Sequence, residues 1–453
     1  MAKERAVEKG ATQGEYPESE YNNPIPVNKA GERLDETSEI WVGHGANWFD
    51  VMASTVTIMI GSGILHYPEA FAFLSWPGGV IYLTICLVGS LYSFWLLGHM
   101  HERDGTRYIT YRSLGVRALG PVWGNIFVGF FQMVYLVGIT IAHTVNAGQG
   151  LKAFYDIVCT EPCAPYGLSA WIITFVGAQL IFMQAPNFHS YRSLVALAAF
   201  CSIAYCWIAV GGSIHDGYTE YDGHPGRHNL NGFSFQNGFF NVIASLGAIL
   251  FSSGSQNISM EVQAQLPAPS FPAFWKGICV AFLIICFCDY PVAIAGYWAY
   301  GNKCQDNVYS NISGPPWMKA VGYMLIVIHM VGANQVAMMP VFDLIEETLH
   351  RRRIISGFPS RLVVRSIITV LIGAIAVTLP FFGTILNFIG GVASCAVIFW
   401  IPPLLWVILV RGNQRHPIFN LSLVVIWIIV GLLACIGALR EVIVIATHYH
   451  FFS

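Results

Sequence analysis

The chain has 453 residues, of which 55% are hydrophobic and only 11% are charged, and its formal net charge at pH 7 is −2. Soluble domains carry about 25% charged residues, so this composition, with a mean hydropathy of +0.57, excludes an ordinary soluble protein. The small net charge gives no indication of nucleic-acid binding. We therefore expect a polytopic membrane protein of the all-α class, which has the lipid bilayer as its main partner.

The first 46 residues differ from the rest of the chain. They are polar, with five Lys/Arg against nine Asp/Glu, and they show no apolar periodicity. Such a segment cannot bury enough apolar surface to fold, so residues 1–46 are predicted to be a disordered cytosolic tail. We expect no secretory signal peptide, and the first apolar segment then serves as the targeting signal. Residues 47–452 are predicted to form the transmembrane domain.

Apolar stretches of the roughly 20 residues needed to cross a bilayer follow in regular order. The sequence predicts eleven spans, near 48–75, 77–100, 122–150, 169–185, 193–214, 238–263, 275–299, 317–345, 363–382, 384–410 and 418–445. The boundary between the ninth and tenth spans depends only on the sequence LPFFGTILN, and ten spans would result if that pair were one helix.

Lys and Arg are unevenly divided between the two sets of connecting segments. With the tail placed in the cytosol, 18 of the 23 cations fall on the cytosolic side. Because cytoplasmic loops carry an excess of Lys and Arg, the N-terminus is predicted to be cytoplasmic and the C-terminus extracellular.

Two spans are interrupted by small and polar residues. The first span contains the sequence IGSGIL near its middle, and the sixth contains the polar run LFSSGSQNISMEV. Unpaired backbone groups are tolerated at membrane depth only where they line a cavity or are buried in protein. Five spans separate the breaks, so the two halves have opposite orientations, and paired breaks of this kind mark the central site of a transporter. The predicted units are repeat one at 48–214, repeat two at 238–410 and an extra helix at 418–445.

A broken helix offers free N–H groups to a carboxylate and free carbonyls to an ammonium group, and a site with both recognises a zwitterion. We expect the carboxylate near Ser62–Ile64 and the ammonium near Leu250–Ser253. The alternative interpretation is that the small residues only allow close helix packing. The predicted substrate-binding residues are Ile60, Gly61, Ser62, Gly63, Ile64, Leu250, Ser252, Ser253, Gly254 and Asn334.

Ionisable side chains inside spans are costly and are therefore candidates for function. His66 and Glu69 are three residues apart and share a helix face after the first break. They are predicted either to exchange a proton with the exterior or to form a structural ion pair. Glu261, after the second break, is predicted to take a proton or, as we prefer, to brace the unwound backbone by accepting hydrogen bonds.

Several segments resemble a known family. The sequence GSGILHYPEAFAFLSWPGG resembles the first-span motif of the amino acid/auxin permease family, and NISMEVQAQLP and HMVGANQVAMMPVFDLIE resemble its lysine/histidine transporter-like branch. The resemblance extends from about Trp48 to Phe452. It implies a leucine-transporter-type fold with two inverted five-helix repeats, proton-driven import of amino acids with no cofactor beyond the coupling proton, and a location in the plasma membrane.

Some positions depart from that branch. A histidine is usual at Gln256, a tyrosine near His143, and an aromatic residue at Asp289. We therefore hypothesise that His143 and Asp289 form a pair that compensates for the missing histidine, the alternative being that a backbone carbonyl or water satisfies each separately. The candidates for proton coupling or gating are His66, Glu69, His143, Gln256, Glu261, Asp289 and His329.

Two further features concern the outer side. Cys159 and Cys163 are predicted to form a disulfide in an oxidising exterior, with two free thiols as the alternative. Asn311 begins an NIS sequon, which is a glycosylation signal. We expect no metal site, because no His or third Cys stands at zinc spacing.

The function predicted first is a proton-coupled amino acid importer that works by alternating access. The alternatives are an influx carrier for an auxin-like indole acid, export from a vacuole, and an amino-acid sensor that binds without transporting. A channel is disfavoured because paired breaks favour an occluding site. No P-loop, dinucleotide fingerprint or nucleophile elbow suggests an enzyme, and we expect neither an obligate protein partner nor a nucleic acid.

Overall fold

The structure is a computed structural model that describes residues 45–103, 106–159, 163–184, 192–219, 235–354, 357–378, 382–410 and 417–446. Residues 1–44 of the predicted tail lie outside this set, so the expectation of disorder is not tested.

The described residues are almost entirely helical, with one short hairpin. The elements of the first part of the chain are α1 (Trp48–Met59), the 3-10 turn η1 (Ser62–His66), α2 (Tyr67–His101), β1 (Glu102–Arg103), β2 (Thr106–Arg107), α3 (Tyr111–Trp123), the π-helix η2 (Gly124–Gly129), α4 (Phe130–Val158), α5 (Leu168–Phe182) and α6 (Arg192–Thr219). Those of the second part are α7 (Phe235–Ser252), η5 (Gln256–Ile258), α8 (Ser259–Gln263), α9 (Phe271–Tyr300), η6 (Gly301–Lys303), η7 (Val308–Ser310), α10 (Pro316–Arg351), α11 (Gly357–Thr378), α12 (Phe382–Ile389), the π-helix η8 (Gly390–Trp400), α13 (Ile401–Leu409) and α14 (Pro417–Ala446).

Many of these helices suit a bilayer. In the described part of the chain, nine helical runs are long and apolar enough to cross a membrane. Their outward faces are apolar, with 76% of Ile181, 72% of Leu283 and 82% of Ile418 exposed, whereas His143, Asp289 and other polar groups are buried. An apolar exterior around a partly polar interior suits a protein surrounded by lipid, so the chain is an all-α polytopic membrane protein.

The predicted boundaries between spans correspond to breaks in the helices. The boundary predicted between the first and second spans lies at Ser75, inside α2. Ser75 has a φ of 60°, and Pro77 follows two residues later. The span predicted near 169–185 corresponds to α5, an apolar helix of 15 residues that is shorter than the nine long runs. Helices α11 and α12, which correspond to the ninth and tenth predicted spans, are separate elements.

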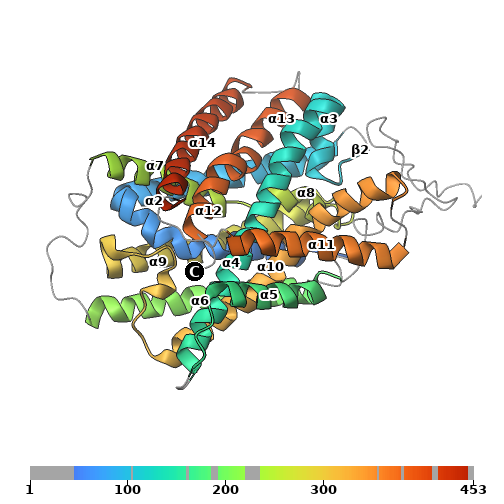
Figure 1. Cartoon of the computed structure of the whole chain (residues 1–453). Coiled ribbons are helices and arrows are strands. Elements are labelled where there is room, and N and C mark those ends of the chain that lie inside the picture. Colours follow the sequence, from blue (N-terminus) through green and yellow to red (C-terminus); the bar gives the residue numbers. More distant parts are fainter. Residues whose placement is uncertain are drawn as a thin grey trace, which may run out of the picture.

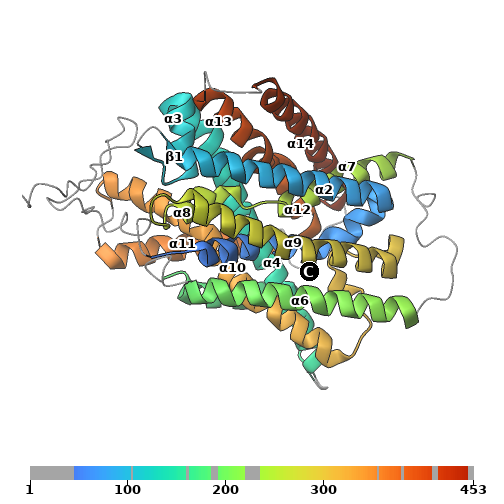
Figure 2. The ribbon, with the colours of Figure 1, turned by 180° about the vertical axis from the view of Figure 1, so that it is seen from behind.

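The long helices form a closely packed bundle. Helix α9 lies between α2 and α6 (Figure 2), and α4 packs on α10, which in turn packs on α6. Helices α3, α13 and α14 lie together along one side, at the top of Figure 1, and α14 packs on α7 and η8. We call the end of the molecule that holds residues Glu102–Arg107 the hairpin end; β1 and α8 lie there (Figure 2).

A sharp turn brings α3 back against the next helix. Gly120 has a φ of 82°, a conformation that favours glycine, and Pro121 follows it. Beyond this turn, Gly124 lies so close to Val116 that a Cβ on Gly124 would be 2.4 Å from the Cα of Val116. The residues of α3 therefore fold back on η2. This turn lies inside the helical run Tyr111–Val158.

Candidate functional site

The first predicted break is present in the structure. Helix α1 ends at Met59, Ile60 has φ −83° and ψ 60°, and Gly61 is extended, with φ −100° and ψ −151°. The chain resumes as a 3-10 turn at Ser62 and continues into α2. The backbone is therefore non-helical at Ile60 and Gly61, at the middle of the predicted span.

The second predicted break is present as well. Helix α7 ends at Ser252, and the chain is non-helical from Ser253 to Ser255 before η5 and α8 begin. These residues are buried, so the unwound backbone lies inside the bundle and not in lipid.

The two breaks touch each other. A Cβ built on Gly63 would lie 1.7 Å from the Ser252 hydroxyl oxygen, a separation that two atoms cannot adopt. Only a glycine allows η1 and the end of α7 to approach this closely. Residues about 190 positions apart thus meet at one place, as the transporter interpretation of the sequence requires.

Two buried tyrosines bind the carbonyls of the breaks. The Tyr205 hydroxyl on α6 lies 2.9 Å from the Ile60 carbonyl oxygen and 3.0 Å from that of Gly61. The Tyr135 hydroxyl on α4 lies 3.1 Å from the Phe251 carbonyl and 3.2 Å from that of Gly254. The sequence did not predict that either tyrosine binds the backbone of the breaks. The Phe251 carbonyl, predicted to meet an ammonium group, already accepts from Tyr135.

Asp289 on α9 has an unusual environment. Both of its carboxylate oxygens are buried and neither has a hydrogen-bond partner among the described residues. Its electrostatic neighbours include Tyr67 at the start of α2 and Cys288, and Tyr67 in turn neighbours Ser252 and Ser253. The Tyr67 hydroxyl faces this carboxylate as well as Ser252 and Ser253. A buried carboxylate thus lies beside both breaks with a tyrosine hydroxyl as its polar neighbour.

The hypothesised pair of His143 and Asp289 is not formed. Nδ1 of His143 lies 3.0 Å from Oδ1 of Asn334, and the described residues show no hydrogen bond or ion pair between His143 and Asp289. The physical reason is that each side chain meets a different helix: His143 meets α10, and Asp289 meets the start of α2. His143 nevertheless lies at the first break, since its Nε2 would be 3.3 Å from a Cβ on Gly61.

His329 and Asn334 are brought to the same region by α10. Nδ1 of His329 lies 2.9 Å from the Ala198 carbonyl, and its ring packs edge-on against Tyr205 with centroids 5.6 Å apart. Both residues are fully buried. The structure therefore groups His143, His329 and Asn334 around the carbonyls that Tyr205 binds.

Glu261 lies on α8, which follows the second break and η5. Its Oε1 is 3.1 Å from Nε2 of Gln132 and 3.4 Å from the backbone nitrogen of Tyr111. The Gln132 amide also donates to the Asn257 carbonyl at 2.6 Å. Gln256 donates instead to the backbone and hydroxyl oxygens of Ser90, each at 2.9 Å. Glu261 therefore reaches η5, next to the break, only through Gln132, and its predicted role in bracing the unwound backbone remains a prediction.

His66 and Glu69 pair as their spacing predicted. Nδ1 of His66 lies 2.9 Å from Oε2 of Glu69, and also 3.1 Å from the carbonyl oxygen of Asp306 in the segment 301–313 between α9 and α10. The pairing is confirmed, whereas the predicted exchange of a proton through it remains a prediction.

Further hydrogen bonds hold the segment 301–313 and the end of α9. The Tyr309 hydroxyl donates to the Tyr205 carbonyl at 2.7 Å. Asp216 near the end of α6 accepts from the backbone nitrogen of Ser313 at 2.7 Å and from the Tyr300 hydroxyl at 2.8 Å. This segment thus lies at the end of the bundle opposite to the hairpin end, where α6 and α9 finish.

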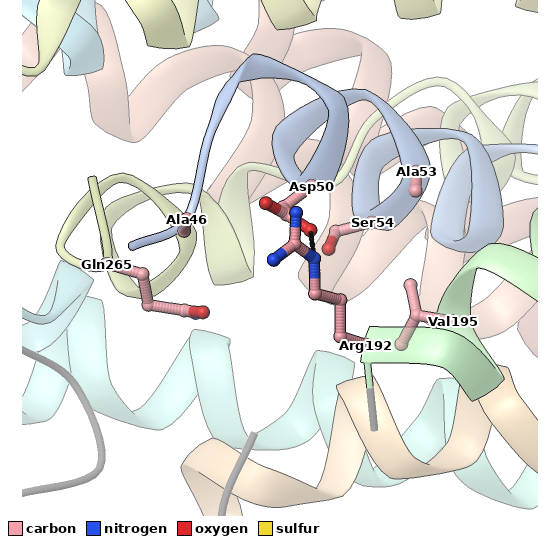
Figure 3. A pocket seen from close by; sticks show the side chains of 7 residues that line it. All are labelled: Ala46, Asp50, Ala53, Ser54, Arg192, Val195 and Gln265. Atoms are coloured by element: carbon pink, nitrogen blue, oxygen red, sulfur yellow. Dashed lines mark ion pairs between the residues drawn. The ribbon is translucent and has the colours of Figure 1, made fainter. Parts of the chain in front are cut away.

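A pocket lies at the start of α1, near the hairpin end (Figure 3). It is partly open to solvent, has about 330 Å³ of empty space including that open part, and is lined by Ala46, Asp50, Ala53, Ser54, Arg192, Val195 and Gln265. An ion pair between Asp50 of α1 and Arg192 of α6 lies in its wall (Figure 3). The pocket lies beside the first half of α1 and not at the two breaks.

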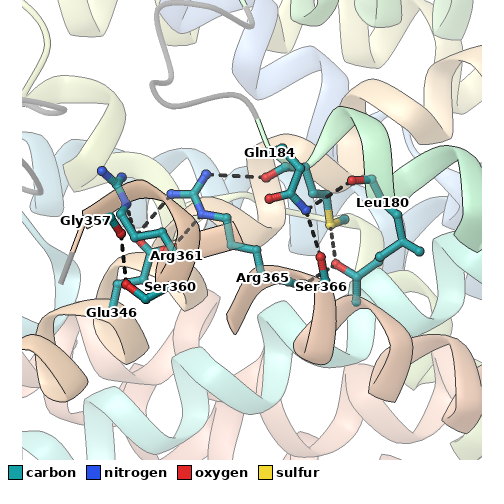
Figure 4. A network of polar contacts seen from close by, with 10 residues as sticks. Leu180, Gln184, Glu346, Gly357, Ser360, Arg361, Arg365 and Ser366 are labelled. Atoms are coloured by element: carbon teal, nitrogen blue, oxygen red, sulfur yellow. Dashed lines mark hydrogen bonds and ion pairs between the residues drawn. The ribbon is translucent and has the colours of Figure 1, made fainter. Parts of the chain in front are cut away.

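A second charged group joins α10 to α11 (Figure 4). Glu346 is fully buried, and its carboxylate accepts from Arg365 at 2.6 Å and from Arg361 at 3.1 Å. Arg365 also approaches the Met183 carbonyl at 3.4 Å, next to the end of α5. The sequence indicates only that these arginines lie on the cytosolic side, and not that they bind a buried carboxylate.

The two features predicted for the outer side have different outcomes. Cys159 and Cys163 form a disulfide, with their Cα atoms 6.0 Å apart, which confirms the preferred prediction. The Asn311 side chain accepts from the backbone nitrogen of Gln305 at 2.8 Å and donates to the Lys303 carbonyl at 3.0 Å. A glycan on Asn311 would have to displace the second bond. Among the described residues, no group of three His, Cys, Asp or Glu could hold a metal ion.

Comparison with known proteins agrees with this geometry. A family described as transmembrane amino acid transporter protein matches residues 44–444. Lysine histidine transporter-like 6 of Arabidopsis thaliana is 34% identical over 94% of this chain and 99% of its own length. Lysine histidine transporter-like 1 from the same plant is 31% identical over 96% and 97%, and its GABA transporter 1 is 28% identical over 94% and 97%. Because the family match covers nearly all of the chain beyond the tail, this protein belongs to the amino acid/auxin permease family of transmembrane amino acid transporters.

Proposed function

We propose that this protein is a secondary active transporter that imports amino acids by proton symport with alternating access. The observation that carries the proposal is the contact between the two helix breaks at Gly63 and Ser252. Unwound backbone buried at one point in the bundle is the arrangement by which such transporters hold a small zwitterion. The names of the relatives, lysine histidine transporter-like and GABA transporter, support an amino acid as the substrate.

The fold proposed for this function has eleven spans. The run Trp48–His101 is 54 residues long and is bent at Ser75, so it contributes two spans to the count, and the shorter α5 contributes one more to the nine long runs. With eleven spans, the halves 48–214 and 238–410 are inverted repeats of five spans each, and α14 is the extra helix. This is the leucine-transporter-type arrangement that the resemblance implies.

The substrate is proposed to lie at the breaks. Its carboxylate would accept from the N–H groups of Ser62–Ile64, and its ammonium would face the region of Leu250–Ser253. The buried Asp289 carboxylate, which has no hydrogen-bond partner among the described residues, adds a negative charge that favours an ammonium there. The remaining polar donors and acceptors come from Asn334 and His329 of α10.

Alternating access requires a closure at each end of the pathway. We infer that the segment 301–313, bound by His66, Tyr205 and Asp216, closes one end. The Asp50–Arg192 ion pair, beside the pocket of about 330 Å³, would close the other. By the bias of Lys and Arg, the hairpin end is cytoplasmic and the C-terminus extracellular, and by resemblance the membrane is the plasma membrane.

The proton is proposed to be carried by one of the buried ionisable groups near the pathway. The candidates for proton coupling or gating remain His66, Glu69, His143, Gln256, Glu261, Asp289 and His329, of which Gln256 does not titrate and is a candidate for gating only. Oε1 of Glu261 is bound by Gln132 and by the backbone nitrogen of Tyr111, whereas its Oε2 is buried without a partner among the described residues.

The test uses the purified full chain in liposomes with an imposed proton gradient. Uptake of a panel of labelled amino acids and of an indole acid is measured, and a protonophore is added to collapse the gradient. Symport predicts accumulation that depends on the gradient and stops with the protonophore. Saturable binding without accumulation would favour the sensor, and uptake of the indole acid alone would favour the auxin-like carrier.

A further inference from the structure

His143 combines complete burial with one unpaired ring nitrogen. Nδ1 lies 3.0 Å from Oδ1 of Asn334. Nε2 is buried and has no hydrogen-bond partner anywhere in the described ranges. The same Nε2 lies beside the first break, 3.3 Å from the position that a Cβ on Gly61 would take. A polar atom without a partner is costly in the interior, and this one faces the break at which the substrate is proposed to lie.

The bond to Asn334 fixes which nitrogen is free. With the Asn334 amide oriented so that its oxygen faces the ring, that oxygen accepts from Nδ1 of His143, and Nε2 of the neutral ring then presents a lone pair. His329 on the same helix as Asn334 repeats this chemistry, because its Nδ1 faces the Ala198 carbonyl, which also can only accept. The free nitrogen of His143 is therefore a proton acceptor that faces the break.

We propose that Nε2 of His143 is the site that takes the transported proton, and that the proton couples there to the carboxylate of the substrate. This inference rests on the function proposed above, in which the carboxylate lies on the N–H groups that follow Gly61. A neutral His143 presents a lone pair to that carboxylate and opposes it. A protonated His143 donates an N–H to the carboxylate and adds an opposite charge. Each ligand therefore strengthens the binding of the other by the same factor, as symport requires.

Other titratable groups near α4 also have unpaired polar atoms. Nε2 of His329, Oε2 of Glu261 and both carboxylate oxygens of Asp289 are buried without a partner among the described residues, but of these atoms and Nε2 of His143 only the latter lies beside the Cβ position of Gly61. His329 of α10 acts on His143 electrostatically, and the hydroxyl of Tyr205 is bound to the Ile60 and Gly61 carbonyls. Helices α5 and α12 bring no titratable side chain to α4. Further groups on elements packed against α4 or next to Tyr205 include His66 (paired with Glu69), Arg361 and Arg365 (paired with Glu346), Cys395 (bonded to the Trp427 carbonyl), and Lys319, Tyr323, Asp343, Glu347 and His350 of α10.

Two substitutions separate the two ring nitrogens. In His143→Asn the amide nitrogen takes the place of Nδ1, which keeps the bond to Asn334 and removes Nε2. In His143→Gln the amide nitrogen takes the place of Nε2 and donates at every pH. The KM for a labelled amino acid is measured in liposomes at about pH 5.5 and about pH 7.5, so that the external proton concentration differs about a hundredfold. His99→Gln is the matched control, because His99 lies near the hairpin end of α2 with Nδ1 bonded to the Trp95 carbonyl.

For the wild type and His99→Gln, we expect the KM to rise about tenfold between the acidic and the neutral pH, as typical coupling energies imply. For both His143 variants the ratio of KM values should fall to about one, and accumulation driven by the proton gradient should be lost. His143→Gln should also have the lower KM at neutral pH, because its amide still donates to the carboxylate. The two variants make different local contacts, so one that folds is sufficient for the test.

If the wild type shows proton-dependent uptake and both variants keep its KM ratio, the assignment to His143 is wrong while the proposed function stands. If the wild type itself shows no dependence on the proton gradient, the proposed symport fails first. A loss of pH dependence in His99→Gln as well would also overturn the assignment, because the effect would then not be specific to the break.

Discussion

At the scale of single residues, Gly63 is the position that the contact between the two breaks depends on most directly. A Cβ at residue 63 would overlap the Ser252 hydroxyl oxygen at 1.7 Å. Gly63→Ala must therefore push η1 away from α7, and overpacking of this kind costs about 1–3 kcal/mol. We expect a loss of amino acid uptake of about tenfold or more, since about 1.4 kcal/mol corresponds to one factor of ten. Initial uptake rates normalised to protein in the liposomes give the measurement.

A second substitution tests the cause. Ser252→Gly removes the atoms that the new methyl group at residue 63 would strike, so the double variant should recover part of the lost uptake. Gly177→Ala on α5 is the control, because a Cβ there would meet nothing within 4 Å. Uptake by Gly63→Ala at the level of Gly177→Ala would show that the contact of the breaks is not needed for transport.

Residue identities predicted the breaks but not the groups that bind them. Glycine and serine runs in two apolar spans are conspicuous, and both were found at Gly61 and Gly254. Tyr135 and Tyr205 resemble any other tyrosine of a membrane helix, and their role depends on which way α4 and α6 are turned. The hypothesis that His143 pairs with Asp289 is wrong for the same reason. The sequence predicts that both residues lie in the middle of spans, but the neighbours of each depend on how the helices are rotated and packed.

At the scale of the elements, the ion pair between Asp50 of α1 and Arg192 of α6 joins two helices beside the pocket of Figure 3. The Arg192 side chain is 41% exposed, and pairs of this kind contribute about 0.2–1 kcal/mol. Asp50→Asn should therefore shift the opening of this end by up to about fivefold. A cysteine introduced by Ser54→Cys in the pocket wall reports this shift as a faster reaction with a membrane-permeant thiol reagent.

The exchange of both charges is the control for that effect. Asp50→Arg with Arg192→Asp restores an opposite pair between the same helices and should return the labelling rate of Ser54→Cys towards its original value. Asp50→Asn without Ser54→Cys measures the reaction of the native cysteines. An unchanged rate at Ser54→Cys after Asp50→Asn would show that the pair does not hold this end closed.

The sequence predicted which long helices form better than it predicted the turns and short elements between them. Apolar length located the helices, but some ends differ by several residues, as for α4, which ends at Val158 where the span was expected to end at 150. Ser75 marks the bend where the first predicted span ends. The fold of α3 back on η2 was not predicted, because Gly120 and Pro121 lie in a polar segment that resembles a loop. The short hairpin β1–β2 was missed for a related reason, since its strands are only two residues long and carry no alternating pattern.

At the scale of the whole molecule, the buried cluster of Glu346, Arg361 and Arg365 connects α10 to α11 and, through Met183, to the end of α5 (Figure 4). The positive-inside rule placed these arginines near the cytosol, but it could not predict that a fully buried carboxylate binds them. The side chains of Glu346 and Arg365 are 0% and 2% exposed. Each of these buried charges needs its partner. The loss of one side chain of the cluster should therefore disturb the packing of α10, α11 and α5 together.

The cluster predicts an order of stabilities. Glu346→Gln keeps the shape but leaves two arginines without their carboxylate, and loss of one partner from a buried pair costs about 3–5 kcal/mol. Arg365→Met should cost less, because Arg361 still pairs with Glu346. Arg361→Gln should cost less again, because Arg361 is 17% exposed. Lys152→Ala breaks the exposed pair with Asp156 and should cost at most about 1 kcal/mol. Midpoints of thermal unfolding of the purified variants in one detergent give this order.

The double variant Glu346→Leu with Arg365→Met separates lost charge pairing from lost packing. It removes both buried charges, and apolar replacement of such pairs is often neutral or stabilising, so its midpoint should lie above that of Glu346→Gln. Arg361 is then left near an apolar side chain, but its partial exposure lets it reach water. If the double variant unfolds at or below the midpoint of Glu346→Gln, the cluster stabilises the bundle by its shape, and α10, α11 and α5 do not depend on the pairing of its charges.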